Sequence, residues 1–132
     1  KLPGISLLDA YTVAGKKRFI GNVTAKTEYP MPKTLAGFEN HSGLTYIEGE
    51  TKPLAIVDVG AGNNNEDKTE GARYKNVFGT YLHGSFLPKN PHFADLLIKL
   101  AIEKRYGEGI ELEKVNDELE FNAHMALINR PY

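Results

Sequence analysis

The chain has 132 residues, a formal net charge of −1 and no cysteine. This length suits one compact domain, and a composition of 41% hydrophobic and 25% charged residues is that of an ordinary folded protein. The 16 basic and 17 acidic residues are balanced, which excludes a field strong enough to attract nucleic acid or an acidic membrane surface.

The absence of cysteine excludes disulfides and thiolate metal sites and fits the reducing cytoplasm. No apolar run is long enough for a transmembrane helix, and the first residues lack the core of a signal peptide. We therefore expect a cytoplasmic protein without a transmembrane segment. The sequence runs from Lys1 almost directly into strand-like residues, which suggests a fragment whose natural beginning lies upstream.

Strand-type patterns dominate the first part of the chain. Residues 5–11 read as a strand, and residues 18–27 are rich in β-branched and aromatic side chains. The Gly-Lys-Lys run at 15–17 predicts a turn between these two strands. The sequence therefore predicts an antiparallel hairpin at the start of the chain.

A second short hairpin is predicted further on. Residues 35–40 and 45–47 flank the turn-forming pair at 42–43, and residues 54–59 form an apolar, strand-like run. Residues 60–67 are polar and rich in glycine and asparagine, which indicates a loop on the surface or facing a substrate.

Residues 77–82 predict a buried strand that carries His83 at its carboxyl end. Asn90 and Pro91 then have the pattern of an N-cap and a first helical residue, and the helix extends to about Gly107. The spacing of three and four places its buried face on Phe93, Leu96, Leu97, Leu100 and Ala101. In α/β units of this kind, ligands bind at the carboxyl ends of strands, where His83 lies.

A second helix is predicted to begin near Asn116 and Asp117 and to end before Pro131. Its expected buried face comprises Leu119, Ala123, Ala126 and Leu127. The sequence contains no internal repeat and no domain boundary.

Phosphate and metal chemistry receive little support from the sequence. The glycines of residues 60–62 lack the rest of a dinucleotide or P-loop pattern, and residues 63–67 lack the alternation of a calcium loop. The four histidines are not spaced as metal ligands usually are; they are His41, His83, His92 and His124. We therefore expect no metal site and no cofactor in this chain.

Serine catalysis is equally unsupported, because the nucleophile-elbow pattern is absent and Ser42 and Ser85 lie in predicted turns. Ser85 is also too close to His83 in sequence to form an ordinary pair of nucleophile and base. On periodicity alone, His83 reads as a satisfied histidine at the end of a strand.

Several motifs in order resemble one enzyme family. Residues 37–43 (GFENHSG), 62–64 (GNN), 71–84 (GARYKNVFGTYLHG) and 87–91 (LPKNP) are similar to the cobyric-acid-synthase-like branch of class I glutamine amidotransferases. Within this branch, the chain most resembles the amidotransferase subunit of lipid II isoglutaminyl synthase. The resemblance covers nearly the whole chain, from Ile5 to about Gly107.

This resemblance implies an α/β, flavodoxin-like domain of which the chain is the distal part, with a mixed sheet and C-terminal helices. It implies glutamine hydrolysis, with His83 as the base that activates a cysteine thiol and then protonates the departing ammonia. Arg18 corresponds to a position expected to grip the α-carboxylate of L-glutamine, although it also reads as the end of a basic turn.

The implied partner is a Mur-ligase-like subunit that uses ATP and Mg²⁺ and amidates D-glutamate in the lipid II stem peptide. The implied assembly is a heterodimer in peptidoglycan synthesis. Two alternatives remain at this point: the glutaminase domain of a cobyric acid or corrinoid a,c-diamide synthase, and a non-catalytic binding module that retains the fold.

The chain departs from the family pattern in two respects. It contains no cysteine, so we expect residues 1–132 to be the C-terminal portion of a single domain whose nucleophile lies in an upstream half. Ser85 stands where ordinary class I enzymes place the glutamate that orients the histidine, so a carboxylate of the partner is expected to do this. Residues 39–41 are expected to line the mouth of the active site or a partner interface, or to form a polar hairpin end. Arg73 and Tyr74 are expected to cover the glutamine pocket, unless the loop at residues 60–74 is a partner-binding segment or a mobile lid.

Overall fold

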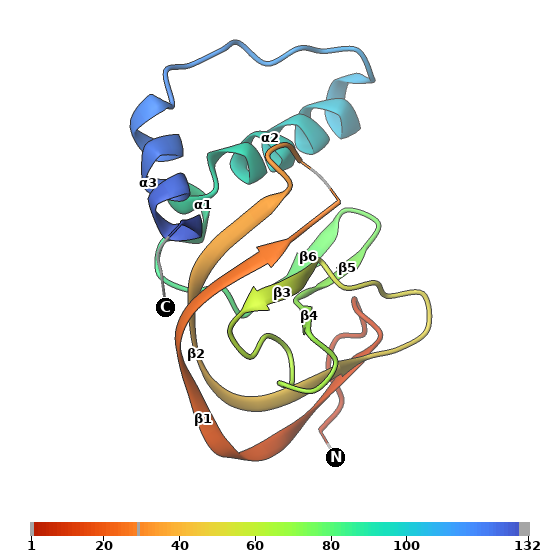
Figure 1. The fold of residues 1–132 in the computed structure, drawn as a ribbon. Helices are drawn as coiled ribbons and strands as arrows, with labels where there is room; N and C mark the ends of the chain where they lie inside the picture. The colour runs from red at the N-terminus through yellow and green to blue at the C-terminus, as the bar shows by residue number, and fades with distance from the viewer. Residues whose placement is uncertain (1, 29, 130–132) are drawn as a thin grey trace.

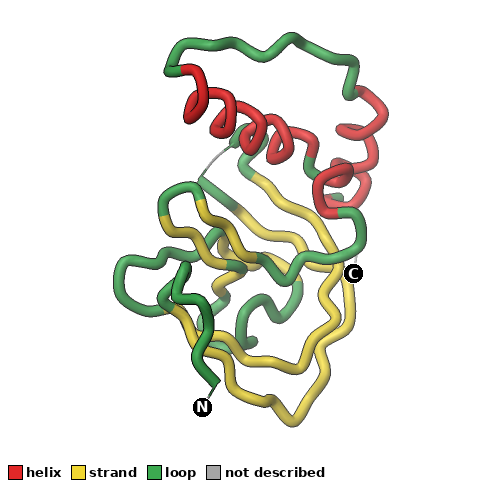
Figure 2. Tube along the Cα trace, turned by 180° about the vertical axis from the view of Figure 1, so that it is seen from behind, coloured by secondary structure: helices red, strands yellow, loops and turns green. Residues whose placement is uncertain are grey.

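The computed structural model describes residues 2–28 and 30–129 and shows an α/β domain with its helices gathered at one end of the strands (Figures 1 and 2). The main sheet has the order β2-β1-β3-β4 and comprises β1 (Ala10–Lys26), β2 (Thr34–Ile47), β3 (Ala55–Val59) and β4 (Thr69–Glu70). A small second sheet comprises β5 (Ala72–Tyr74) and β6 (Val77–Gly79). The helices are α1 (Phe86–Lys89), α2 (Pro91–Tyr106) and α3 (Glu118–Ile128). The predicted α/β class with C-terminal helices is confirmed, and all strand pairs in the described residues are antiparallel.

The predicted strand at residues 5–11 is wrong for most of its length, because β1 begins at Ala10. Ala10 pairs with Ile47, the last residue of β2, so residues before Ala10 have no strand to pair with. Apolar side chains in this leading segment are accordingly exposed, as at Leu2 and Ile5. Apolar composition therefore did not suffice to make a strand without a partner.

Both turns predicted within the first half are wrong. The pairing of β1 with β2 runs from Ala10 opposite Ile47 to Lys26 opposite Thr34, so the two strands form one long hairpin. The register shifts between Ala14 and Phe19, because residues 15–18 face a single residue of β2. A β-bulge of this kind bends a strand and absorbs its turn-like residues without ending the pairing.

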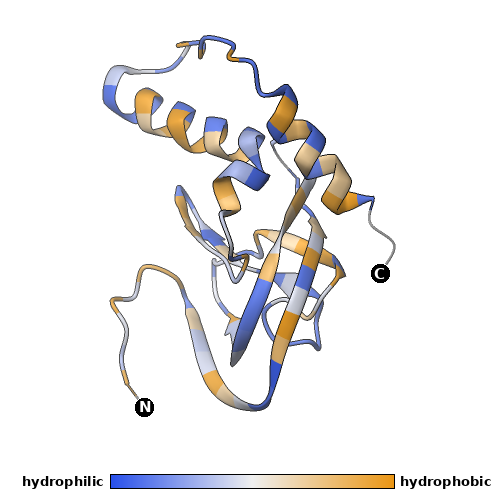
Figure 3. Cartoon of the chain, turned by 90° about the vertical axis from the view of Figure 1, so that its left-hand side faces the viewer, coloured by the Kyte–Doolittle hydropathy of each residue, from blue (hydrophilic) through white to orange (hydrophobic). Residues whose placement is uncertain are grey.

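The core lies between the strands and α2, and Figure 3 shows apolar residues recurring along this helix and the strands beneath it. It comprises Val23, Ala25, Leu35, Leu54, Ala55, Val57, Leu82 and Phe93. Burial of apolar surface of this kind is the main stabilising contribution to such a domain. None of the helices in the described residues has the length and apolarity needed to cross a membrane.

The predicted start of α2 is confirmed, with Asn90 at the N-cap position and Pro91 as the first helical residue. The Asn90 side chain makes no capping bond; instead it accepts from the Ala36 amide at 2.8 Å and donates to the carbonyl oxygens of Ala36 at 2.8 Å and Phe86 at 2.7 Å. Asn90 is completely buried and joins the start of α2 to β2. The short helix α1 was not predicted.

The second predicted helix is present as α3, but its predicted buried face is wrong. Leu119 is 77% exposed, whereas His124 is completely buried. His124 donates from Nδ1 to the Lys89 carbonyl at 2.7 Å, and its Nε2 lies 2.8 Å from Thr34 Oγ1. Polar contacts rather than an apolar stripe therefore orient α3, and these cannot be read from helical periodicity. The helix ends at Ile128, which confirms the predicted end before Pro131.

Candidate functional site

The segment that carries His83 is not the continuous strand predicted for residues 77–82. Strand β6 ends at Gly79, and residues 80–82 pair with no strand. His83 then forms an isolated antiparallel bridge with Phe38 of β2, in which the His83 amide donates to the Phe38 carbonyl at 2.7 Å. Leu82, the preceding residue, is buried in the core. The backbone of His83 is therefore fixed both by its bridge to Phe38 and by the packing of Leu82.

The side chain of His83, in contrast, is exposed. Among the described residues, neither ring nitrogen has a hydrogen-bond partner, and the chain turns away at once through Gly84 (φ 69°) and Ser85 (φ 62°). Such left-handed backbone at Ser85 is uncommon for a residue other than glycine and marks a tightly specified turn. The histidine is thus presented on a fixed backbone with an unpaired ring.

Arg18 and His83 lie toward the same face of β2. Glu39 and His41 are buried on one face of this strand, which places Phe38 and Asn40 on the other. Arg18 donates from Nε to Asn40 Oδ1 at 2.7 Å. His83 lies directly opposite Phe38 in an antiparallel bridge, and such opposite residues have their side chains on the same face. Phe38 and Asn40 are two residues apart, which is about 7 Å along a strand. Arg18 itself is exposed and lies in the bulge of β1, not in a hairpin turn.

Glu39 and His41 form a buried support and do not line the mouth of a site at the His83 face. Glu39 accepts hydrogen bonds from the amides of Ala61 at 2.9 Å and Gly62 at 3.1 Å. His41 donates from Nδ1 to the Gly43 carbonyl at 2.9 Å, and its Nε2 lies 3.6 Å from a Glu39 oxygen. Asn40, between them, lies within a strand and not at a hairpin end.

The loop at residues 60–67 is present as predicted, but residues 61–64 are buried rather than on the surface. Asn63 binds both backbone groups of Gly71, accepting at 2.8 Å and donating at 2.9 Å. Asn64 Oδ1 accepts from the amides of Glu66 and Asp67. These asparagines therefore stabilise the loop internally. No group of three or more potential metal-ligating side chains occurs in the described residues.

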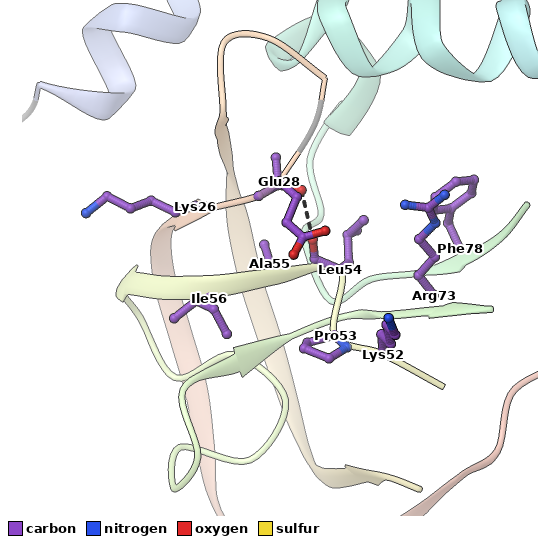
Figure 4. Close-up of a pocket in the computed structure, with 10 residues that line it drawn as sticks. Lys26, Glu28, Lys52, Pro53, Leu54, Ala55, Ile56, Arg73 and Phe78 are labelled. Atoms are coloured by element: carbon purple, nitrogen blue, oxygen red, sulfur yellow. Dashed lines mark hydrogen bonds between the residues drawn. The ribbon is translucent and has the colours of Figure 1, made fainter. Parts of the chain in front are cut away.

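Arg73 contacts residues of its own β5–β6 hairpin. It donates from Nε to the Lys75 carbonyl at 3.1 Å, and its guanidinium lies 5.4 Å from the ring centre of Phe78. Figure 4 shows this pair beside a pocket of about 230 Å³ that is also lined by Lys52. Neither Arg18 nor His83 lines the pocket, so the pocket is separate from the candidate site.

The structure thus places an exposed histidine and an exposed arginine toward one face of β2. A model of the CobB/CobQ-like glutamine amidotransferase domain matches residues 1–91. The chain therefore belongs to this family, and the resemblance seen in its motifs is confirmed.

Two relatives are named as the GatD subunit of lipid II isoglutaminyl synthase (glutamine-hydrolyzing). The chain is 42% identical to that of Staphylococcus aureus over 130 residues, which cover 98% of this chain and 51% of the relative. It is 40% identical to that of Streptococcus pneumoniae over 120 residues, which cover 90% of this chain and 46% of the relative. The chain thus spans about half the length of these relatives.

A third relative is a probable cobyric acid synthase of Methanothermobacter thermautotrophicus. It is 41% identical over 86 residues, which cover 64% of this chain and 16% of the relative. The similarity to both kinds of enzyme agrees with the family branch predicted from the motifs.

Proposed function

We propose that the intact protein hydrolyses L-glutamine and supplies ammonia to a Mur-ligase-like partner, which amidates D-glutamate in the lipid II stem peptide. The observation that carries the proposal is the placement of Arg18 and exposed His83 toward one face of β2, in a chain 42% identical to a glutamine-hydrolysing subunit over 98% of its length. The proposed protein works in the cytoplasm as a heterodimer, and ATP and Mg²⁺ bind to the partner ligase.

The chemistry starts from a poor electrophile, because the side-chain amide of glutamine resists attack and ammonia is a poor leaving group. A thiolate with an imidazole base divides the reaction into formation and hydrolysis of a thioester. His83 takes the thiol proton, donates a proton to the departing ammonia, and then activates water. Residues 1–132 contain no cysteine, so the proposal requires a thiol from outside them.

Arg18 supplies the proposed contact with the α-carboxylate. Its guanidinium is permanently charged and can donate two parallel hydrogen bonds to a carboxylate. Asn40 already engages Nε, which restricts the plane of the guanidinium. Glutamine bound at Arg18 could then extend along β2 and place its side-chain amide toward His83.

The unpaired ring of His83 has a further implication. Without an acceptor on one nitrogen, an imidazole does not have a fixed tautomer, and catalytic histidines are usually oriented by a carboxylate. Within this proposal, a carboxylate of the partner subunit orients His83 and makes glutamine hydrolysis depend on assembly. A lone full-length subunit that hydrolyses glutamine as fast as the complex would contradict this.

A glutaminase domain that serves a cobyric acid or corrinoid a,c-diamide synthase is the second candidate, and the similarity to cobyric acid synthases supports it. The two candidates differ in the acceptor of ammonia and not in the chemistry of His83. Supplying the complex with lipid II or with a corrinoid and following amidation by mass spectrometry separates them.

The central experiment replaces His83 by alanine in the intact complex. Amidation that depends on glutamine should be abolished, while amidation with free ammonia should persist, because the ligase site is untouched. Loss of both activities would show that His83 has a structural role. Retention of both would rule out His83 as the catalytic base.

A further inference from the structure

Glu70, the last residue of β4, is a completely buried carboxylate directly linked to the segment that precedes His83. One oxygen, Oε1, accepts hydrogen bonds from the Thr80 hydroxyl at 2.6 Å and from the Tyr81 amide at 2.9 Å. The other oxygen, Oε2, is buried without a hydrogen-bond partner. No ion pair in the described residues includes Glu70.

This link continues through Thr80 to the next residue. The Thr80 hydroxyl, which donates to Glu70, also accepts from the Leu82 amide at 3.0 Å. Glu70 therefore fixes two residues directly and a third through the threonine. These are residues 80–82, which have no strand pairing of their own and end at the bridge between His83 and Phe38.

A purely structural role does not account for a carboxylate at this place. Burying a charge without a cation is destabilising, and apolar residues of similar volume commonly stabilise such positions. Burial in fact raises the pKa of Glu70, and the nearby charge of Glu39 adds to this effect. The carboxylate provides a strong hydrogen-bond acceptor at Oε1. The short bond to Thr80 is typical of hydrogen bonds to charged acceptors.

The main sheet gives Glu70 a rigid base. Its backbone pairs with Ala55 of β3, and its carbonyl accepts from the Leu54 amide at 3.0 Å. The side chain thus fixes residues 80–82, and through them His83, relative to the main sheet.

We propose that Glu70 is a positioning residue for His83, whose buried carboxylate fixes residues 80–82 and so sets where the imidazole meets the substrate. This inference rests on the proposed glutaminase function. Because Glu70 acts only through the backbone of His83, it should affect the chemical step and not the binding of glutamine at Arg18.

The test compares Glu70→Leu and Glu70→Gln in the full-length protein with its ligase partner. The leucine variant loses the acceptor, and a displacement of about 1 Å at a catalytic group can lower kcat about a hundredfold. Its KM for glutamine should stay unchanged. The glutamine variant keeps a carbonyl oxygen for Thr80 and Tyr81, and should retain most of the activity. Val57→Ala, which loosens the core of the same sheet, is the matched control for a loss of stability alone.

Hydrogen exchange gives a readout that does not depend on activity. Loss of a buried hydrogen bond corresponds to an increase of roughly tenfold to a hundredfold in local exchange. In Glu70→Leu this increase should be confined to residues 80–83, whereas Val57→Ala should affect the sheet broadly. If Glu70→Leu does not fold, Thr80→Val removes the hydroxyl that links Glu70 to the Leu82 amide and keeps the bond to the Tyr81 amide, so it should give the same pattern with a smaller increase.

Wild-type kcat and wild-type exchange at residues 80–83 in Glu70→Leu or Thr80→Val would overturn the inference. So would a Glu70→Gln variant as impaired as the leucine variant, or a loss of kcat no larger than that of an equally destabilised Val57→Ala. A wild-type complex without glutaminase activity would instead overturn the proposed function, and the exchange comparison would still decide whether Glu70 fixes residues 80–82.

Discussion

Arg18 donates a hydrogen bond of 2.7 Å from Nε to Oδ1 of Asn40, which joins the bulge of β1 to the face of β2 beside His83. Arg18 makes no other hydrogen bond or ion pair among the described residues. Both terminal nitrogens of the guanidinium therefore remain available to a carboxylate. The contact holds the guanidinium of this long, exposed side chain in one plane. The cost in conformational entropy is small on the side of Asn40, because Asn40 is itself fixed within a strand.

Arg18→Ala should raise the KM for glutamine about 10- to 100-fold, since hydrogen bonds to a charged group contribute roughly 1.5–3 kcal/mol. The effect on kcat should be much smaller. Steady-state glutaminase measurements on the intact complex test this. Arg18→Lys, which keeps the charge but not the fork of donors, serves as the matched control and should be intermediate. An unchanged KM in Arg18→Ala would remove Arg18 from the substrate site.

Asn40→Ala should raise the same KM less than Arg18→Ala does, because the guanidinium remains but is no longer held in its plane. The double variant should be no worse than Arg18→Ala alone, since the two residues act as one unit and their effects are then not additive. A double-mutant cycle on KM measures this coupling. Fully additive effects would show that Asn40 does not act through Arg18.

Glu70 should make the protein less stable as the pH rises. Burial raises its pKa above the ordinary value of 4.5, so above that pH the unfolded chain binds fewer protons than the folded one. By linkage, the free energy of unfolding falls as the pH rises from about 4.5 through the folded-state pKa. Urea unfolding of wild type and Glu70→Gln should be compared from about pH 4.5 up to the folded-state pKa of Glu70. Over this range the stability of wild type relative to Glu70→Gln should fall as the pH rises. A constant difference would contradict the prediction.

His92 should have the opposite effect. Its Nε2 donates to the Thr34 carbonyl at 2.8 Å while Nδ1 is buried without a partner, and desolvation lowers its pKa from 6.5. The hydrogen bond to Thr34 and the charge of Asp95 raise the pKa, and His124 lowers it, but burial dominates. Below pH 6.5 the unfolded chain therefore binds more protons than the folded one, and the protein becomes less stable as the pH is lowered.

His92→Phe removes this titration and retains an aromatic ring against Phe121, which stacks on His92 at 6.0 Å between ring centres. At neutral pH the variant should be less stable than wild type, because it lacks the hydrogen bond to Thr34. On acidification it should lose less stability than wild type does. Thermal unfolding at a series of pH values measures both effects. Parallel pH profiles of the two proteins would show that His92 does not cause the acid sensitivity.

The sequence predicted the elements whose signals are local. Pro91 after Asn90 marked the start of α2, and the motifs ending at His83 identified the family. The bulge at residues 15–18 was read as a turn because glycine and lysine favour both, and only pairing with the distant β2 distinguishes them. Glu70 gave no signal, since a glutamate in a polar stretch does not reveal its burial.

The side of β2 away from β1 would otherwise be an open edge of the main sheet. Along this edge, the carbonyl of Thr34 accepts from His92, both backbone groups of Ala36 bind the Asn90 amide, and those of Phe38 pair with His83. An unpaired edge strand is a template for pairing with other molecules, and covering it prevents aggregation. The residue proposed for catalysis therefore also closes this edge, so its backbone protects the protein from intermolecular β-sheet formation while its side chain is free to react.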